Sequence, residues 1–172
     1  TGCLSEAAYY IESKGEAAVI DPLRDIDVYL ELANERKAKI KYIFETHFHA
    51  DFVSGHIDLA KKTGAQIIYG PMAETKYKIY NAKDGEEFKI GKLTIRAMHT
   101  PGHTMESTCY LLLVESGKQH AVFTGDTLFV NDVGRPDLLD GSGISKEFLA
   151  GKMYDSLEAK IKTLADDVLV YP

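Results

Sequence analysis

The stretch "FETHFHADFVSGH", residues 44–56, decides how this chain of 172 residues is interpreted. It follows an apolar segment and places His47, His49 and Asp51 at every second position. In an extended backbone, side chains two residues apart point to the same side of the chain. We therefore expect these three side chains to converge at the end of a strand. Imidazole and carboxylate groups together suit zinc or iron, so the stretch predicts a metal site.

Two further clusters offer metal ligands. In "HTPGHT", residues 99–104, two histidines lie four positions apart, but the Pro-Gly pair between them excludes a helix. A turn should therefore present one histidine, and we favour His103, because His99 ends a β pattern and is expected to pack or form hydrogen bonds. In "VFTGDTLF", residues 122–129, Asp126 follows an apolar strand and a glycine. Its carboxylate either closes a turn or projects into a cleft.

The rest of the chain interleaves β-rich blocks with single helices. This order predicts an α/β protein in which two β-sheets pack together with helices outside. Asp25 could cap the first helix. The expected strands cover residues 6–13, 16–22, 40–47, 65–70, 86–90, 92–100, 108–116, 120–126 and 167–172, and the expected helices cover 25–37, 56–64 and 144–164. No repeat, low-complexity tract or linker divides the chain, so residues 1–172 are expected to form one domain.

The composition of the chain argues against several classes of function. A formal net charge of −6 argues against non-specific binding to nucleic acids or anionic membranes, which requires a basic surface. No apolar run approaches the roughly 20 residues of a membrane span. Cys3 and Cys109 lack a CxxC motif and are expected to be reduced structural thiols. We expect a cytoplasmic protein, although a chain that begins at Thr1 could have lost a targeting segment.

The three histidine and aspartate motifs, in this order, resemble the metallo-β-lactamase superfamily. Its hallmark is HxHxDH, then a histidine in a TPGHT-like turn, an aspartate after TGD, and a histidine after "YP". The resemblance covers essentially the whole chain and implies an αββα sandwich of two mixed sheets, with metals at one edge. The domain would lack its C-terminal end, because the last histidine of the pattern would follow Pro172.

The chain departs from the two-metal members of this superfamily at Asp51-Phe52, where they have an Asp-His pair. Phenylalanine cannot bind a cation, so a single-metal site is the better interpretation. His56 could substitute, but it is more simply explained as a packing or capping residue at the start of the next helix. A single iron is typical of the persulfide dioxygenase branch, which occurs in bacterial fusions with rhodanese domains. The stretches at 1–27 and "VGRPDL" at 133–138 also resemble that branch.

The resemblance to this branch implies a role for each candidate residue. His47, His103 and Asp126 would bind one Fe²⁺ and form the catalytic centre, with zinc as the alternative metal. His49 and Asp51 would orient the ligands or ordered water. The resemblance also implies that Arg135 would contact an anionic part of the thiol substrate or brace the site through Asp137. From the residues alone, Arg135 could instead form only a surface ion pair with Asp137 or Asp140.

The implied reaction oxidises a low-molecular-weight persulfide, such as glutathione persulfide, with O₂ to sulfite and free thiol. One alternative is a zinc-dependent thioester hydrolase that resembles glyoxalase II, the hydroxyacylglutathione hydrolase, in which metal-bound hydroxide attacks the thioester. A minor alternative is a non-catalytic persulfide-binding module. The expected partners are the persulfide and O₂, together with a fused or associated rhodanese domain; a homodimer is also compatible with the resemblance.

Overall fold

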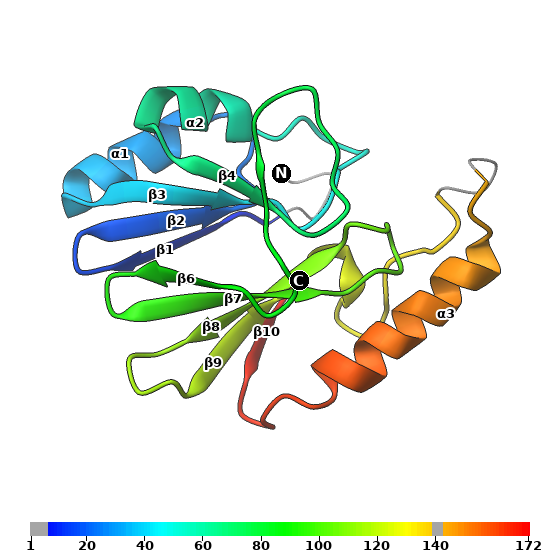
Figure 1. The fold of residues 1–172 in the computed structure, drawn as a ribbon. Coiled ribbons are helices and arrows are strands. Elements are labelled where there is room, and N and C mark those ends of the chain that lie inside the picture. The colour runs from blue at the N-terminus through cyan, green and yellow to red at the C-terminus, as the bar shows by residue number, and fades with distance from the viewer. Residues whose placement is uncertain (1–6, 139–142) are drawn as a thin grey trace.

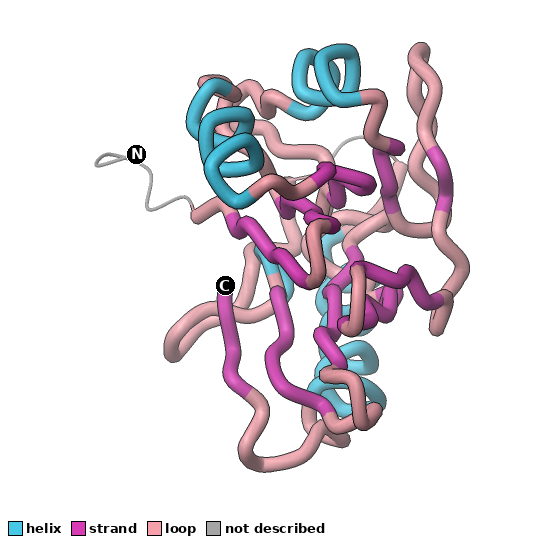
Figure 2. Tube along the Cα trace, turned by 90° about the vertical axis from the view of Figure 1, so that its left-hand side faces the viewer, coloured by secondary structure: helices cyan, strands magenta, loops and turns pink. Residues whose placement is uncertain are grey.

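Two five-stranded β-sheets pack face to face in the computed structural model, which describes residues 7–138 and 143–172. Helices cover the outer faces of the sheets (Figure 1), and the view turned by 90° in Figure 2 shows strands and helices in the same layers. The predicted α/β sandwich of two mixed sheets flanked by helices is confirmed.

The first sheet has the order β1-β2-β3-β4-β5. Its first two strands form an antiparallel hairpin, and the remaining pairs are parallel. Parallel neighbours need long crossovers, and α1 and α2 occupy two of these connections. The elements are β1 (Tyr9–Ser13), β2 (Glu16–Ile20), α1 (Asp27–Arg36), β3 (Lys39–Phe44), α2 (His56–Thr63), β4 (Gln66–Tyr69) and β5 (Tyr80–Asn81).

The second sheet has the order β10-β9-β8-β7-β6. Its first four strands in the chain are antiparallel neighbours, and β10 joins β9 in parallel. In the described part of the connection from β9 to β10, a 3₁₀ turn is followed by α3 and a π-helical turn. The elements are β6 (Glu87–Ile90), β7 (Leu93–His99), β8 (Thr108–Leu113), β9 (Gln119–Phe123), a 3₁₀ turn (Gly125–Thr127), α3 (Lys146–Ser156), a π-helical turn (Leu157–Ile161) and β10 (Leu169–Tyr171).

The main core lies between the two sheets. Phe44 of β3 is fully buried there, and its ring centroid is 5.4 Å from that of Phe88 and 4.7 Å from that of Tyr110. A second buried cluster joins the first sheet to α1 and α2 through residues such as Val19, Ile43 and Leu59. β2 and β3 are therefore covered on both faces, which explains their nearly continuous apolar sequences.

Several predicted helices and strands begin or end at other residues in the structure. α1 begins after Asp25, whose carboxylate accepts a hydrogen bond from the Asp27 amide, although Ile26 holds the capping position. The helix predicted at 144–164 ends at Ser156 and continues as the π-helical turn. The short β5 was not predicted, because its two residues are exposed and lie in a polar segment. α2 ends at Gly64 as predicted, with the left-handed backbone (φ +73°) that glycine favours.

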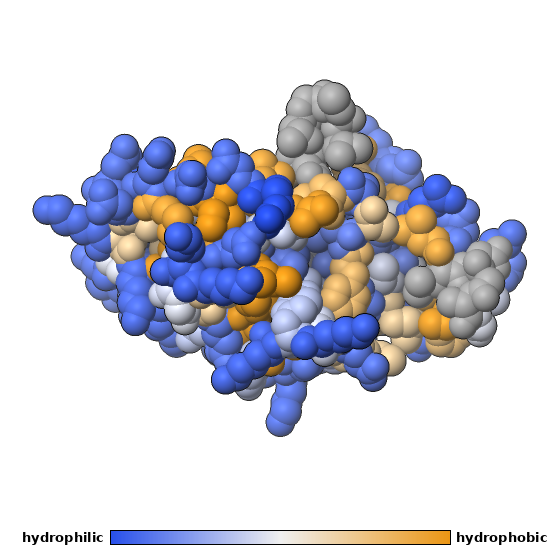
Figure 3. All heavy atoms as spheres, turned by 90° about the horizontal axis from the view of Figure 1, so that it is seen from above, coloured by the Kyte–Doolittle hydropathy of each residue, from blue (hydrophilic) through white to orange (hydrophobic). Residues whose placement is uncertain are grey.

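Much of the face shown in Figure 3 is hydrophilic, with apolar groups exposed between the charged ones. Across the described part of the chain, no helix combines the length and apolar character needed to cross a membrane. Cys109 is buried in the second sheet, whereas Cys3 lies outside the described residues.

Candidate metal centre

Three loops at one edge of the sandwich bring two histidines and a carboxylate together. His47 follows β3, His103 lies in the turn between β7 and β8, and Asp126 belongs to the 3₁₀ turn after β9. The Asp126 Oδ2 atom is 3.3 Å from His103 Nε2 and 3.9 Å from His47 Nε2. Their ligand atoms all lie within 4.8 Å of one another, a spacing that can hold one metal ion. A cavity of about 390 Å³ opens beside all three residues.

The hydrogen bonds of His47 leave its Nε2 lone pair directed towards this centre. The Thr46 hydroxyl donates to Asp21 Oδ2 at 2.7 Å, so its oxygen accepts from His47 Nδ1–H at 2.9 Å. Burial, with the nearby charge of His49, lowers the pKa of His47 to about 3. His47 is therefore a neutral imidazole at neutral pH, the form that binds metals.

His103 is also oriented by a hydrogen bond at its Nδ1 atom. Its Nδ1–H donates to the backbone carbonyl of Arg135 at 3.0 Å, which leaves Nε2 facing Asp126. Histidine ligands commonly bind a carbonyl through the nitrogen that does not face the metal. Gly134 permits this contact, because a Cβ atom there would lie 1.9 Å from the Asp126 carbonyl oxygen and 3.0 Å from His103 Nδ1.

These three donors fit a divalent transition metal. Both imidazoles present Nε2, and the carboxylate supplies the negative charge. Burial raises the pKa of Asp126, although His103 and His49 act in the opposite direction. Two histidines and one carboxylate match the donor set of mononuclear iron oxygenases, and the same atoms also suit zinc.

The expected convergence of His47, His49 and Asp51 is wrong. β3 ends at Phe44, so the alternation of an extended strand does not continue through the motif. His47 faces the metal centre, His49 turns towards Asp21, and Asp51 is exposed at the mouth of the cavity.

His49 belongs to a second cluster, which sequence reasoning did not find. Its Nε2 atom is 3.1 Å from Asp21 Oδ1 and 3.7 Å from Glu45 Oε2. Burial disfavours the charged ring, but the two carboxylates outweigh it and raise the pKa of His49 to about 9. The Nε2 side of His49 therefore faces these two carboxylates. The available signal was an acidic residue directly after the buried β2 strand, since Asp21 follows Ile20.

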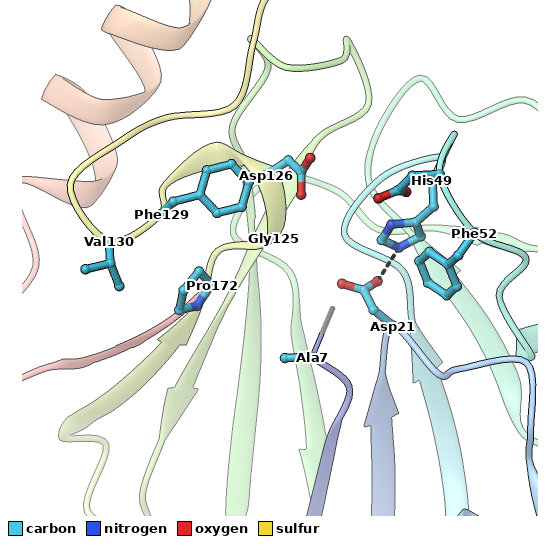
Figure 4. Close-up of a pocket in the computed structure, with 10 residues that line it drawn as sticks. Ala7, Asp21, His49, Phe52, Gly125, Asp126, Phe129, Val130 and Pro172 are labelled. Atoms are coloured by element: carbon cyan, nitrogen blue, oxygen red, sulfur yellow. Dashed lines mark ion pairs between the residues drawn. The ribbon is translucent and has the colours of Figure 1, made fainter. Parts of the chain in front are cut away.

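A second cavity, of about 570 Å³, shares Asp51, Asp126 and Phe129 with the first. Figure 4 shows its lining: the His49 ring points towards Asp21, the Phe52 ring lies beside it, and Asp126 stands across the pocket. The ring centroids of His49 and Phe52 are 4.4 Å apart. Phe52 is thus a wall residue at the position where an Asp-His pair would place an imidazole.

Arg135 lines the smaller cavity together with the three candidate ligands. Its guanidinium donates two hydrogen bonds to Asp137, at 2.6 and 2.8 Å, and this pairing lowers the pKa of Asp137 to about 2. The side chain is largely exposed. Its position is compatible with contact to an anionic substrate, while its backbone carbonyl already orients His103.

The two remaining histidines of the motifs lie outside the ligand cluster. His99 Nε2 is 2.8 Å from the Met105 carbonyl oxygen, at the end of β7. His56 is buried at the start of α2, where its Nε2 atom is 2.9 Å from the Tyr77 hydroxyl. His56 therefore packs at the start of the helix.

An αββα sandwich with two histidines and a carboxylate gathered at one edge defines a metal-binding enzyme fold. The chain belongs to the metallo-β-lactamase superfamily, whose family model matches residues 1–171.

Curated relatives are hydrolases by name. The chain is 34% identical over 158 residues to a probable hydroxyacylglutathione hydrolase of Schizosaccharomyces pombe, which covers 90% of this chain and 57% of that protein. It is 33% identical to the cytoplasmic hydroxyacylglutathione hydrolase of Arabidopsis thaliana, over 98% of this chain and 64% of the relative. The chain thus spans less than two thirds of the length of either relative.

Solved structures match the fold closely. A metallo-β-lactamase from Staphylococcus aureus has a TM-score of 0.87 and 38% identity, covering 98% of this chain and 52% of that one. ETHE1 from Myxococcus xanthus has a TM-score of 0.80 and 32% identity, covering 96% of this chain and 68% of that one.

Proposed function

We propose that this chain forms the catalytic domain of a mononuclear iron persulfide dioxygenase. The observation that carries the proposal is the donor set: His47, His103 and Asp126 converge, while Phe52 stands where a ligand for a second metal would be needed. Persulfide oxidation requires O₂ chemistry, which bound iron(II) would supply. The similarity to ETHE1 is compatible with this branch of the superfamily.

The chain's own residues would prepare the site in three ways. Hydrogen bonds through Thr46 and the Arg135 carbonyl orient His47 and His103 so that their Nε2 atoms face the centre. Asp126 contributes one negative charge, so a divalent ion would retain a net positive charge that attracts a persulfide anion. With three protein donors, a six-coordinate ion would keep three positions for substrate and oxygen.

The two cavities offer room for the substrate. The smaller one joins the candidate ligands to Arg135, whose exposed guanidinium is suited to a carboxylate of a glutathione-type thiol. Phe129 lines both cavities and provides an apolar wall close to Asp126. We propose that the sulfur end lies near Asp126 and that an anionic end of the thiol lies near Arg135.

The second candidate is a zinc-dependent hydrolase that acts on a glutathione thioester. The comparison with curated proteins supports this hydrolase better than the dioxygenase, because both relatives described above carry the name hydroxyacylglutathione hydrolase. The same three donors could hold zinc, whose bound water is a nucleophile near neutral pH. A single-metal centre favours the dioxygenase, whereas the names of the relatives favour the hydrolase. Metal stoichiometry, O₂ uptake and thioester hydrolysis distinguish the two.

The test uses the complete protein purified without added metal, and a second sample loaded with Fe²⁺ under anaerobic conditions. Elemental analysis gives the metal stoichiometry, an oxygen electrode measures O₂ uptake with glutathione persulfide, and a thioester assay uses a hydroxyacylglutathione. We expect one metal per chain in the loaded sample, O₂ uptake with persulfide, and no comparable thioester hydrolysis. Two metals per chain, hydrolysis of the thioester and no O₂ uptake would establish the hydrolase instead.

The purified metal by itself does not decide between the candidates. Affinities of a site for first-row ions follow the general metal series, so zinc or nickel can replace iron during purification. The iron-loaded sample is therefore the decisive one. A rhodanese partner and a homodimer stay predictions, which co-purification and the mass of the complete protein in solution would test.

A further inference from the structure

Glu106 links the two loops that carry the candidate histidine ligands, His47 and His103, whose ring centroids are 4.9 Å apart. It lies three residues after His103, and its buried side chain accepts a hydrogen bond at Oε1 from the Phe48 amide at 3.0 Å. We propose that Glu106 is a positioning residue, which sets the place of the His47 ring relative to that of His103. This inference rests on the metal centre of the proposed function, but not on the choice between iron and zinc.

Two hydrogen bonds from residues 106–108 enclose His47. The Thr108 amide donates to the Thr46 carbonyl at 2.9 Å, and Glu106 accepts from the Phe48 amide. The peptide groups on either side of His47 are therefore both held by the same segment. Fixing these two groups restricts the φ and ψ angles of the residue between them, and those angles limit the directions its side chain can take. The Glu106 contact is made by a side chain, so a substitution can remove it.

The same segment is bound to the turn that carries His103. The Ser107 carbonyl accepts a hydrogen bond from the Thr100 amide at 2.8 Å. The Ser107 hydroxyl accepts another from the Thr104 amide at 3.1 Å. These bonds lie on both sides of His103 in the sequence, so residues 104–108 move with its turn. Through Glu106, the position of this turn is transmitted to the loop of His47.

A close approach from a third segment fixes the backbone of Glu106. Gly70 follows β4, and a Cβ atom there would lie 2.7 Å from the Glu106 carbonyl oxygen and 1.7 Å from the Thr108 hydroxyl oxygen. The Thr108 hydroxyl also donates to the Glu106 carbonyl at 3.0 Å. The side chain of Glu106 therefore extends from a fixed point to the Phe48 amide. Because this amide is uncharged, the position of the accepting oxygen should matter more than the negative charge.

The test separates geometry from charge with three variants of the complete protein. Glu106→Gln keeps the accepting oxygen and loses the charge, Glu106→Asp keeps the charge but withdraws the oxygen by one methylene group, and Glu106→Met has neither. Each metal-free protein is titrated with Co²⁺, whose visible absorption depends on the geometry of its ligands. We expect Glu106→Gln to retain the wild-type affinity and spectrum. Glu106→Asp and Glu106→Met should weaken Co²⁺ binding by roughly 10–100-fold and alter the spectrum.

Glu16→Met is the matched control, because Glu16 Oε2 also accepts a hydrogen bond from a backbone amide, that of Gly91 at 2.8 Å. Glu16 begins β2 and pairs with Lys39 at the start of β3, whereas the loop of His47 follows the other end of β3. This contact therefore lies far from the metal centre. Whatever its urea midpoint, Glu16→Met should retain the wild-type affinity and spectrum. Circular dichroism checks that each variant is folded.

The inference is overturned if Glu106→Met binds Co²⁺ as the wild type does, or if Glu106→Gln loses as much affinity as Glu106→Met. It is also overturned if Glu16→Met loses affinity to the same extent, because the effect would then follow from reduced stability alone. If Glu106→Met does not fold, the comparison of Glu106→Asp with Glu106→Gln decides by the same criterion. These outcomes are distinct from failure of the dioxygenase proposal, which O₂ uptake tests and Co²⁺ titration does not measure.

Discussion

At the scale of single residues, Asp126 supplies the charge of the candidate centre. His47 and His103 are oriented by Thr46 and by the Arg135 carbonyl, respectively. Asp126 is the anionic member of the cluster and lines both cavities. Its replacement should therefore affect both metal binding and the shape of the two cavities.

Replacing Asp126 with alanine should remove metal and activity together. The loss of metal affinity should exceed the roughly 10–100-fold that follows from removing a group that only supports a ligand. His99→Ala is the control, because His99 contacts the Met105 carbonyl instead of the cluster, and it should retain metal. Elemental analysis of both variants checks this, and equal metal loss in both would identify His99 as a ligand.

Phe52 is the residue that should limit the number of metals. Phe52→His places an imidazole next to Asp51, in the cavity that also contains Asp126. In the complete protein we expect measurable uptake of a second metal, some thioester hydrolysis, and less O₂ uptake with persulfide. Phe52→Leu removes the ring without adding a ligand and should bind one metal. If both variants bind the same amount of metal, Phe52 does not exclude the second ion.

At the scale of elements, α3 supports the turn that presents His103. A Cβ atom on Gly102 would lie 2.6 Å from the backbone Cα of Met153. The Ser156 hydroxyl of α3 also donates to the Pro101 carbonyl at 2.8 Å. The "HTPGHT" turn and α3 therefore fit together as one unit, although they are about fifty residues apart in the sequence.

Gly102→Ala should push this turn away from α3. We expect a loss of about 1–3 kcal/mol in the free energy of unfolding, as for other overpacked sites, together with weaker metal binding through His103. Gly151→Ala is the matched control, because nothing lies within 4 Å of its added Cβ in the same helix. Gly151→Ala should raise the free energy of unfolding by about 0.5–1 kcal/mol. Urea unfolding measures both changes, and a neutral Gly102→Ala would contradict the tight packing.

At the scale of the whole molecule, the inter-sheet core fixes the relative positions of the three loops that carry His47, His103 and Asp126. The core contains Phe44 at the end of β3, just before the motif that carries His47. Tyr110 of β8 spans the core, and its hydroxyl donates to the Glu45 carbonyl at 3.0 Å. Packing between the sheets therefore positions the metal loop directly.

Phe44→Ala should cost about 3–5 kcal/mol in the free energy of unfolding, because it opens a cavity in a buried aromatic cluster. Phe148→Ala changes a residue that is 50% exposed on α3, and it should stay within about 0.5 kcal/mol of the wild type. Denaturant midpoints compare the two variants. Similar losses in both would show that the inter-sheet core is not the main source of stability.

The sequence by itself predicted the layers, and its resemblance to the superfamily nominated His47, His103 and Asp126 as candidate ligands. Buried strands carry continuous apolar runs, and Gly64 marks the end of α2 in the chain itself. These features follow from local chemistry, so they can be recognised without knowing which segments meet. The motif order then placed the chain in its superfamily, which the family match confirms.

Only the tertiary structure decided where His49 points. Its position in the motif suggested a shared direction with His47, but β3 ends at Phe44 and the alternation ends there too. Ile20 pairs with Phe44 across β2 and β3, which sets Asp21 beside the loop that begins with Glu45. This register brings together residues more than twenty positions apart in the sequence. It is set by the pairing of β2 with β3, which no local sequence pattern specifies.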